Sequence, residues 1–274
     1  MTISIITINY NNLSGLKKTA KSVRELEYND FEWIIIDGGS CDGSTEFIED
    51  ISNKCPQISF WCSEKDKGVY NAMNKGIKQS KGEYLIFMNS GDCFFSSQTI
   101  ANVFRTPHSA DIIYGDALYV FNDHEELRKV PTKLTFRYIY EYTIYHQSAF
   151  IKRELLITSN GYDESLKIVS DWKMWLIWIL QNKKYEYTKE TICRFDAYGI
   201  STGHDDAILK ERNIVFQKVL PPGMKAIMDE IYSYESITPY QPQLFSIIRR
   251  KKIYKKLISA IIHLIKYFQP TKNK

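Results

Sequence analysis

The chain lacks the short motifs that mark several common classes of enzyme. Its 274 residues contain no G-x-x-x-x-G-K-S/T and no G-x-G-x-x-G sequence, which disfavours a P-loop ATPase and a standard dinucleotide-binding site. No internal repeat is visible. Any chemistry has to be sought outside these motifs.

Cysteine is scarce, and long apolar runs are missing. The five cysteines are an odd number and form no C-x-x-C pair, so neither a disulfide framework nor a zinc site is expected, and a reducing cytoplasm is favoured. The first apolar run, residues 3–8, is short and follows no basic residue, so it predicts neither a signal peptide nor a membrane span. A composition of 44% hydrophobic and 25% charged residues fits a soluble globular protein.

Acidic residues are absent from the last part of the chain. Residues 244–274 hold nine Lys and Arg and no Asp or Glu, whereas the first 243 residues hold 27 basic and 32 acidic residues. Apolar residues recur in this tail at steps of three and four. We therefore expect residues 236–274 to form a basic amphipathic helix on an anionic membrane surface, with packing on the protein or in a dimer as the open alternative. The acidic body argues against a nucleic-acid partner.

Short apolar runs alternate with helical patterns over the first hundred residues. Strands are predicted at 3–8, 33–36, 58–62 and 84–88, and helices at 16–26 after a Ser14 cap, at 45–51 and at 69–77. This alternation predicts a parallel sheet with helices on its faces. Ligands bind such sheets at the loops that follow the strands.

The second half of the chain is less regular. Strands are predicted at 112–114, 117–121, 145–151 and 192–195, and helices after a Ser170 cap and from about residue 205. Trp172 and Trp175 are expected to pack in the core. His146 is either a hydrogen-bonded core histidine or a contact to a phosphate or a metal, and the residues alone leave both interpretations open.

Acidic residues follow two of the predicted strands. Asp37 and Asp42 lie in a glycine-rich loop, Asp92 follows the strand at 84–88, and Asp171 opens a helix. One carboxylate can hold a hard divalent cation that neutralises a diphosphate, and another can take a proton from an attacking hydroxyl. Equally, these residues can close a turn or cap a helix. Both interpretations stay open at this point.

Four stretches of the sequence resemble family 2 glycosyltransferases. They are residues 4–11 (SIITINYN), 36–45 (IDGGSCDGST), 64–76 (EKDKGVYNAMNKG) and 82–92 (GEYLIFMNSGD). His146-Gln147, Ser170-Asp171-Trp172 and Gly199-Ile200-Ser201 then follow in family-like order. The resemblance is closest to the bacterial transferases that build colanic acid, O-antigen and capsule polysaccharides.

The resemblance implies an α/β protein of the GT-A fold over residues 1–235, with a Rossmann-like mixed sheet flanked by helices. It implies a nucleotide-sugar donor, most commonly a UDP-sugar, on residues 1–95, an acceptor on 96–220, and Mg²⁺ or Mn²⁺ as cofactor. By position, the residues that it assigns to the donor are Thr7, Asn9, Asp37, Lys67, Gly68, Asn71, Asn74, Ser90 and Asp92.

The same resemblance assigns two roles in catalysis. Asp92 would be the metal ligand, and Asp171 the general base of an inverting single displacement. Asn89 and Gly91 stand where many relatives have acids, so the metal would take most of its ligands from the diphosphate and water.

These observations predict a cytoplasmic glycosyltransferase of the hexosyltransferase type, bound to the inner face of the cytoplasmic membrane. Its acceptor would be a polyprenyl-diphosphate-linked sugar in surface polysaccharide synthesis, which the resemblance alone implies. One alternative is a sugar nucleotidyltransferase, which would need a glycine-rich phosphate loop where Asn9-Tyr10-Asn11-Asn12 stands. The other is a catalytically decayed protein of the same fold that only binds nucleotide sugars, which the missing acids favour.

Overall fold

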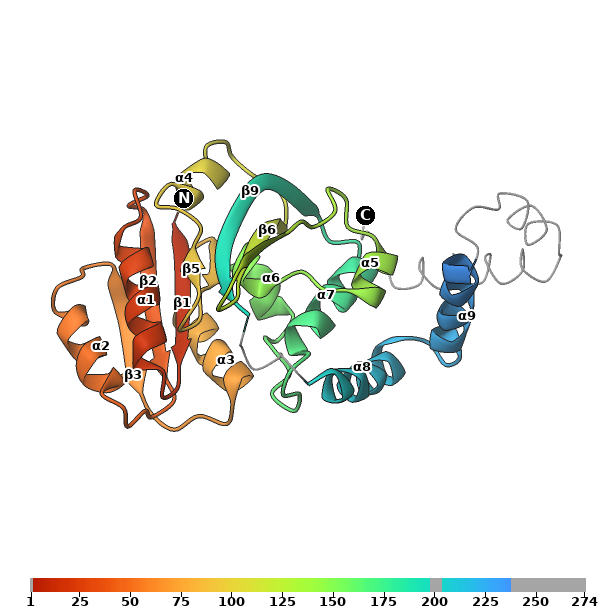
Figure 1. The fold of residues 1–274 in the computed structure, drawn as a ribbon, viewed down its shortest axis with the longest axis horizontal. Helices are drawn as coiled ribbons and strands as arrows, with labels where there is room; N and C mark the ends of the chain where they lie inside the picture. Colours follow the sequence, from red (N-terminus) through yellow and green to blue (C-terminus); the bar gives the residue numbers. More distant parts are fainter. Residues whose placement is uncertain (1, 198–203, 238–274) are drawn as a thin grey trace, which may run out of the picture.

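The computed structural model describes residues 2–197 and 204–237, which form one mixed β-sheet with helices on both faces (Figure 1). The strand order is β3-β2-β1-β4-β8-β6-β9-β5, and β7 pairs with β6. The predicted mixed sheet flanked by helices is therefore confirmed.

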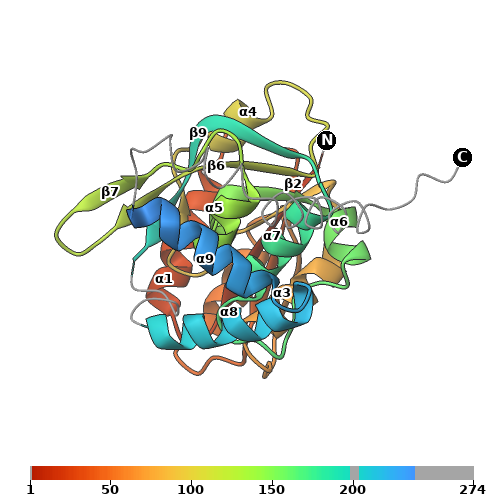
Figure 2. The same cartoon turned by 90° about the vertical axis from the view of Figure 1, so that its right-hand side faces the viewer.

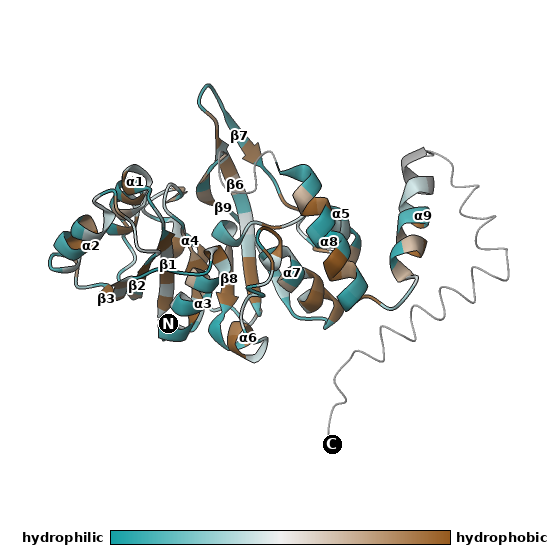
Figure 3. Cartoon of the chain, turned by 90° about the horizontal axis from the view of Figure 1, so that it is seen from below, coloured by the Kyte–Doolittle hydropathy of each residue, from teal (hydrophilic) through white to brown (hydrophobic). Residues whose placement is uncertain are grey.

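The N-terminal half is the parallel part of the sheet. Its strands are β1 (Ile3–Asn9), β2 (Phe31–Asp37), β3 (Ile58–Ser63) and β4 (Tyr84–Phe87), and its helices are α1 (Leu13–Arg24), α2 (Ser44–Ser52) and α3 (Val69–Gln79). Each lies close to its predicted range. Strand β1 lies between β2 and β4, and all seven of its residues are buried, which explains its nearly continuous apolar run (Figure 3).

The two faces of β1 contribute to two cores. Ile3 and Ile5 pack with the apolar residues of α1 and α2, whereas Ile6 and Ile8 pack with those of α3. Helix α3 lies very close to the sheet, because a Cβ added at Gly76 would come within 2.4 Å of Ile6. This close packing fixes the start of α3 beside the carboxyl end of β1.

The other half of the sheet is mixed and irregular. Its strands are β5 (Cys93–Phe94), β6 (Ile112–Val120), β7 (Glu125–Arg128), β8 (Ala149–Lys152) and β9 (Tyr185–Asp196). Strand β6 pairs parallel with β9, whereas the other pairings are antiparallel. Strand β8 joins the halves by pairing antiparallel with both β4 and β6. Figures 1 and 2 show that β6 and β9 curve strongly and that the β6–β7 hairpin projects from the sheet.

Helices cover both faces of this half of the sheet. They are α4 (Thr99–Val103), α5 (Phe136–Glu141), the 3₁₀ turn η1 (His146–Ser148), α6 (Arg153–Thr158), α7 (Ser170–Leu180), α8 (Asp205–Val219) and α9 (Met224–Ile237). Trp172 and Trp175 of α7 are buried at 2% and 0% exposure, so their prediction as core residues is confirmed.

Several predicted boundaries are wrong for local reasons. The predicted strands at 112–114 and 117–121 are one strand, β6, whose register with β9 shifts at Asp116; the polar Gly115-Asp116 pair hid its continuity. The predicted strand 145–151 begins as η1 and becomes a strand only at Ala149. The strand at 192–195 is the buried end of the longer β9, whose earlier residues are mostly half-exposed.

Two predicted helix caps are also wrong. The side chain of Asn12, not that of Ser14, accepts the Gly15 N–H at the start of α1. At α7 the N-cap position is Val169, and the Ser170 hydroxyl instead accepts the backbone N–H of Asp163. Asp171 lies in the first turn of α7, as predicted.

In the described part of the chain, no helix has both the length and the apolar character that crossing a membrane requires. The predicted basic tail lies outside the described residues from position 238 onward, and so does the Gly199-Ile200-Ser201 stretch.

Candidate functional site

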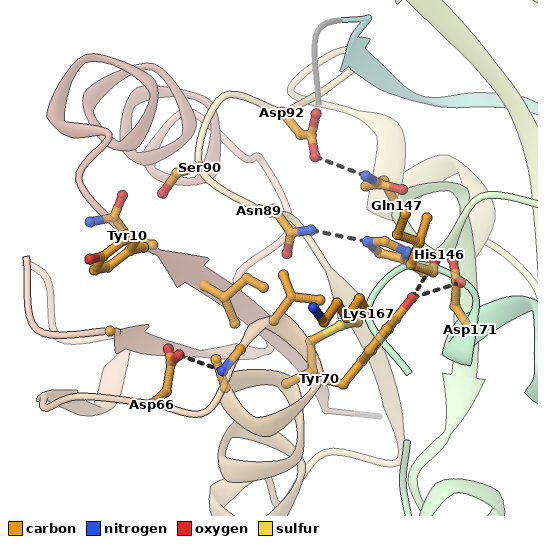
Figure 4. Close-up of a pocket in the computed structure, with 18 of the residues that line it drawn as sticks. Tyr10, Asp66, Tyr70, Asn89, Ser90, Asp92, His146, Gln147, Lys167 and Asp171 are labelled. Atoms are coloured by element: carbon orange, nitrogen blue, oxygen red, sulfur yellow. Dashed lines mark hydrogen bonds and ion pairs between the residues drawn. The ribbon is translucent and has the colours of Figure 1, made fainter. Parts of the chain in front are cut away.

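A cavity of about 900 Å³ opens where β1 and β4 end, between the start of α3 and helices α7 and α8 (Figure 4). Asn9 and Tyr10 line it from the end of β1, and Asn89 and Ser90 from the end of β4. Parallel strands present their carboxyl ends at one edge of a sheet, and ligands of open α/β sheets bind there. The volume lies in the range of small-molecule and cofactor sites.

The cavity brings together half of the residues that the sequence singled out. Those on its wall are Asn9, Gly68, Ser90, Asp92 and Asp171. Those that do not line it are Thr7, Asp37, Lys67, Asn71 and Asn74. The structure gives the latter group contacts within the protein.

Asp37 organises the loop between β2 and α2. Its carboxylate accepts hydrogen bonds from Asn9 Nδ2, Ser40 Oγ, Ser63 Oγ and the backbone N–H groups of Gly39 and Ser40, at 2.6–3.2 Å. Burial alone would raise the pKa of this carboxyl, but the hydrogen bonds from Ser40, Ser63 and Asn9 outweigh burial and hold its pKa below the ordinary value. Asp37 therefore stays ionised and fixes the loop and Asn9 beside the cavity.

Thr7 lies inside the core. Its side chain is fully buried, and its hydroxyl accepts the indole N–H of Trp33 at 2.9 Å. The side chain therefore makes a contact within the protein, and the structure places no face of it on the cavity wall.

Asn71 and Asn74 tie α3 to the loop before α7. The Nδ2 atoms of both residues donate to the carboxylate of Glu164, each at 2.9 Å, and Asn74 also exchanges two hydrogen bonds with the backbone of Tyr162. Lys67 is exposed, and its backbone N–H donates to Asn71 Oδ1. These contacts hold the cavity wall formed by α3 against the segment that carries Asp171.

Asp92 is buried at 5% exposure but lines the cavity. It accepts hydrogen bonds from Gln147 Nε2 and from the backbone N–H of Asp196, both at 3.1 Å. Burial raises its pKa to about 6, because these two hydrogen bonds only partly offset desolvation, and Asp196 adds repulsion. A perturbed buried carboxylate in a cavity is typical of functional sites.

Asp171 faces the same cavity from the first turn of α7, with its side chain 17% exposed. Its Oδ1 accepts from Tyr70 Oη at 3.1 Å and from the Trp172 N–H at 2.8 Å, and its Oδ2 lies 3.0 Å from His146 Nδ1. Burial, together with the charge of Asp171, raises the pKa of Tyr70 well above its ordinary value, so its hydroxyl remains a donor. Figure 4 shows these side chains converging.

Sequence reasoning missed several residues of the cavity wall. They are Tyr10, Asn12, Lys65, Asp66, Tyr70, Asn89, Lys167, Asp196 and Arg212. Arg212 comes from α8, stacks 4.5 Å above the Trp172 ring and donates to the carbonyls of Glu141 and Tyr142. Tyr10 and Asn89 come just after predicted strands, and that feature of the sequence could have identified them. Tyr70 and Arg212 lie on helices, where no sequence feature marked them as residues of a site.

The oxygen atoms of this wall suit a hard divalent cation at a weak site. Within residues 2–197 and 204–237, no group of three or more His, Cys, Asp or Glu side chains could hold a metal. Asp92 supplies a carboxylate, however, and the buried Asn89 Oδ1 and Ser90 Oγ have no hydrogen-bond partner among the described residues. A cation would relieve the repulsion between Asp92 and Asp196, with a diphosphate and water completing its shell.

Solved structures share this architecture. The chain matches a mannosyltransferase from Pyrobaculum calidifontis, in complex with GDP-Man and Mn²⁺, with a TM-score of 0.60 at 15% identity, over 97% of this chain and 84% of that one. It matches S. aureus TarS in complex with UDP-GlcNAc with a TM-score of 0.58 at 19% identity, over 73% of this chain and 59% of that one. These likenesses confirm the GT-A fold.

Relatives in sequence agree with the fold. An uncharacterized glycosyltransferase of Mycobacterium tuberculosis is 30% identical over 73% of this chain and 77% of its own length. A PGL/p-HBAD biosynthesis glycosyltransferase of Mycobacterium bovis is 28% identical over 62% of this chain and 66% of its own. Residues 4–173 match the model of glycosyl transferase family 2. Because that match spans more than half of the chain, the protein belongs to glycosyl transferase family 2 and is a transferase of the GT-A fold.

Proposed function

We propose that this transferase moves one sugar from a nucleotide donor to a hydroxyl of a lipid-linked acceptor, with inversion at the anomeric carbon and with Asp171 as the general base. The observation that carries the proposal is that Asp92 and Asp171 line one cavity from different elements. One carboxylate can then serve the leaving diphosphate while the other faces the attacking hydroxyl. In a single displacement these two groups lie on opposite sides of the anomeric carbon.

The residues around Asp171 suit a base. Tyr70, the Trp172 N–H and His146 hold the carboxylate in one orientation, so little reorganisation is needed when a hydroxyl approaches. The Asp171 carboxylate would accept the proton of that hydroxyl as its oxygen bonds to the anomeric carbon. General-base help of this kind typically contributes about 10²–10⁴-fold to the rate.

Asp92 is proposed to hold Mg²⁺ or Mn²⁺, with Asn89 Oδ1 and Ser90 Oγ as further oxygens of the same wall. When bound, the cation would neutralise negative charge on the departing diphosphate. Asn9, Gly68 and the loop fixed by Asp37 would hold the nucleotide, with Thr7, Lys67, Asn71 and Asn74 supporting that wall from behind or from its rim.

The donor and acceptor classes rest on the relatives. The structures that share the fold hold UDP-GlcNAc in one case and GDP-Man in another, so a nucleotide diphosphate sugar, probed first as UDP-sugars, is the proposed donor. The name of the Mycobacterium bovis relative assigns it to PGL/p-HBAD biosynthesis, which supports a lipid-linked acceptor. A polyprenyl-diphosphate-linked sugar of surface polysaccharide synthesis remains our specific proposal.

The test of Asp171 separates binding from turnover. A panel of UDP-, GDP- and dTDP-sugars is screened with wild-type protein for transfer to a short polyprenyl-diphosphate sugar, and the active donor is then used with Asp171→Asn. We expect transfer to fall at least 100-fold while donor binding, measured by calorimetry, changes less than threefold. Near-normal turnover of Asp171→Asn would refute the assignment of the base.

The metal is tested by its removal. EDTA should stop transfer, and Mn²⁺ should restore it. In addition, Mn²⁺ should tighten UDP binding to the wild-type protein but not to Asp92→Asn, as measured by calorimetry without turnover. Full activity in chelator would contradict the metal role.

Peripheral attachment to the inner face of the cytoplasmic membrane is proposed from the basic residues at 244–274. The full chain is mixed with vesicles that contain anionic lipid and with vesicles of phosphatidylcholine alone, and bound protein is recovered by flotation. We expect binding to the anionic vesicles only, weakening as salt rises. Equal recovery from both kinds of vesicle, or from neither, would contradict this proposal.

A further inference from the structure

His146 lies between the two sides of the cavity. Its Nδ1 is 3.0 Å from Asp171 Oδ2, and its Nε2 is 3.0 Å from Asn89 Nδ2 (Figure 4). Asp171 belongs to α7, and Asn89 follows the parallel strand β4. One imidazole ring therefore contacts the proposed base and the loop that carries Asp92.

The 3₁₀ turn η1 directs the side chains of His146 and Gln147 to different carboxylates, those of Asp171 and Asp92. Gln147, the next residue, donates from Nε2 to Asp92 Oδ2 at 3.1 Å. The turn leads directly into β8, which pairs with β4, so its backbone is fixed to the sheet. His146 also packs its ring edge-on against Phe87 of β4, with 6.2 Å between ring centroids. The backbone of η1 and the ring of Phe87 therefore fix the position of the imidazole.

The two contacts of His146 define its tautomer. An ionised Asp171 only accepts hydrogen bonds, so His146 Nδ1 must carry the proton. Asn89 presents its Nδ2 donor to His146, so Nε2 must carry the lone pair. The neutral Nδ1–H form satisfies both partners, and Asn89 Oδ1, a buried atom of a residue that lines the cavity, has no partner among the described residues.

We propose that His146 is a positioning residue for the reaction, whose Nδ1–H group holds the Asp171 carboxylate in the orientation that accepts the acceptor proton. The inference rests on the proposed function, since it assigns His146 a role through the proposed base. His146 does not itself need to touch the substrate. Loss of such a contact displaces a reacting group slightly, which lowers the rate without weakening donor binding.

Two substitutions separate the two nitrogen atoms of His146. His146→Asn places an amide N–H near the former Nδ1, so it can still donate to Asp171. His146→Gln reaches the position of the former Nε2 and loses the contact with Asp171. We expect His146→Gln to lower kcat at least tenfold with donor KM within twofold, and His146→Asn to stay within threefold of wild type. Equal losses in both variants, or a raised donor KM at unchanged kcat, would overturn the proposal.

A second comparison asks whether His146 acts through Asp171. In an Asp171→Asn background, where residual transfer is measured with more enzyme and longer times, His146→Gln should lower the rate by less than twofold. A further tenfold loss would show an independent role. If Asp171→Asn itself turns over normally, the proposed function fails, whereas the wrong pattern in the His146 variants with an inactive Asp171→Asn sinks only this inference.

Spectroscopy gives a readout without turnover. In protein with ¹⁵N-labelled histidine, the ring signals that disappear in His146→Gln should report a protonated Nδ1 and an unprotonated Nε2, and should shift in Asp171→Asn. The opposite tautomer would contradict the proposed contact.

His108 provides a matched control. It is also mostly buried and bonds a carboxylate, with Nδ1 2.9 Å from Glu186 Oε1, but it does not line the cavity. His108→Gln should leave kcat within twofold of wild type. Thermal unfolding of all variants is measured, and comparable midpoints for His146→Gln and His146→Asn show that their difference in kcat does not come from folding.

Discussion

Asp37 and Asp92 are two buried carboxylates that follow parallel strands, yet their surroundings differ in kind. Asp37 accepts five hydrogen bonds, and its pKa is held below the ordinary value. Asp92 accepts two, and its pKa is raised to about 6. Position at a strand end therefore does not decide what a carboxylate does.

The difference teaches that hydrogen-bond saturation separates a loop-building carboxylate from a chemically available one. Asp37 is fully occupied by the protein and organises a loop. Asp92 lines the cavity and accepts only two hydrogen bonds among the described residues, and burial leaves its charged form poorly stabilised. Substitutions of Asp37 and Asp92 test this contrast directly, and substitutions of Thr7 and Tyr70 extend it to two other buried side chains.

The largest effect on stability is expected from Asp37→Ala. Five donors lose their acceptor, so the free energy of unfolding should fall by about 3 kcal/mol or more. Asp42→Ala is the matched control in the same loop, because its exposed carboxylate accepts from the N–H groups of Leu13 and Ser44, and its loss should lower stability clearly less. Urea denaturation measures the free energy of unfolding of both variants. Equal losses in Asp37→Ala and Asp42→Ala would contradict the special role of Asp37.

Asp92→Asn should raise the free energy of unfolding at neutral pH, the opposite of the effect expected from Asp37→Ala. The unfolded chain releases the Asp92 proton near pH 4 and the folded protein only near pH 6, so ionised Asp92 destabilises the folded state increasingly as pH rises between these values. Relative to wild type, Asp92→Asn should gain on the order of 2–3 kcal/mol from pH 4 to pH 7 while losing transfer activity. A difference between the two proteins that is independent of pH would contradict the raised pKa.

Thr7→Val tests whether a residue assigned to the donor acts only through the fold. The substitution leaves the buried indole N–H of Trp33 without its acceptor, so stability should fall by about 2 kcal/mol. Donor affinity, measured by calorimetry at a temperature where the variant is folded, should stay within twofold. A tenfold loss of donor affinity with unchanged stability would show that Thr7 contacts the donor directly.

The smallest effect is expected from Tyr70→Phe. Its hydroxyl lies 2.6 Å from the Ile168 carbonyl and 3.1 Å from Asp171, so it shares its hydrogen bonding between that carbonyl and the proposed base. We expect kcat to fall about fivefold, equivalent to about 1 kcal/mol, with donor KM unchanged. Initial rates at saturating acceptor measure this; a loss as large as that of Asp171→Asn would assign Tyr70 a direct part in the chemistry.

Much of the parallel half of the fold could be predicted from sequence. The run at β1 is apolar at nearly every position because both faces are covered, and the α3 pattern is apolar on one face because only that face meets the sheet. The second half could not be predicted as well. Gly115 and Asp116 interrupt β6 locally, and the strand persists because β8 and β9 pair with it on either side.

The candidate site was only half predictable for the same reason. Asn9, Gly68, Ser90 and Asp92 lie in the stretches that resemble family 2 glycosyltransferases, and the resemblance assigned them to the donor. Tyr70 and Arg212 enter the cavity from helices, and their contacts with Asp171 and Trp172 join distant segments. A sequence pattern records local periodicity and contains no information on such long-range contacts.

By itself the sequence determined the family, the parallel strands and the acidic residues at their ends, because these follow from local hydrophobic periodicity and from motifs of adjacent residues. Only the tertiary structure decided that Asp37 is saturated while Asp92 is not, and that His146 joins Asn89 to Asp171. Hydrogen bonding and burial depend on which distant segments the sheet brings together, and the same carboxylate changes its chemistry with those neighbours.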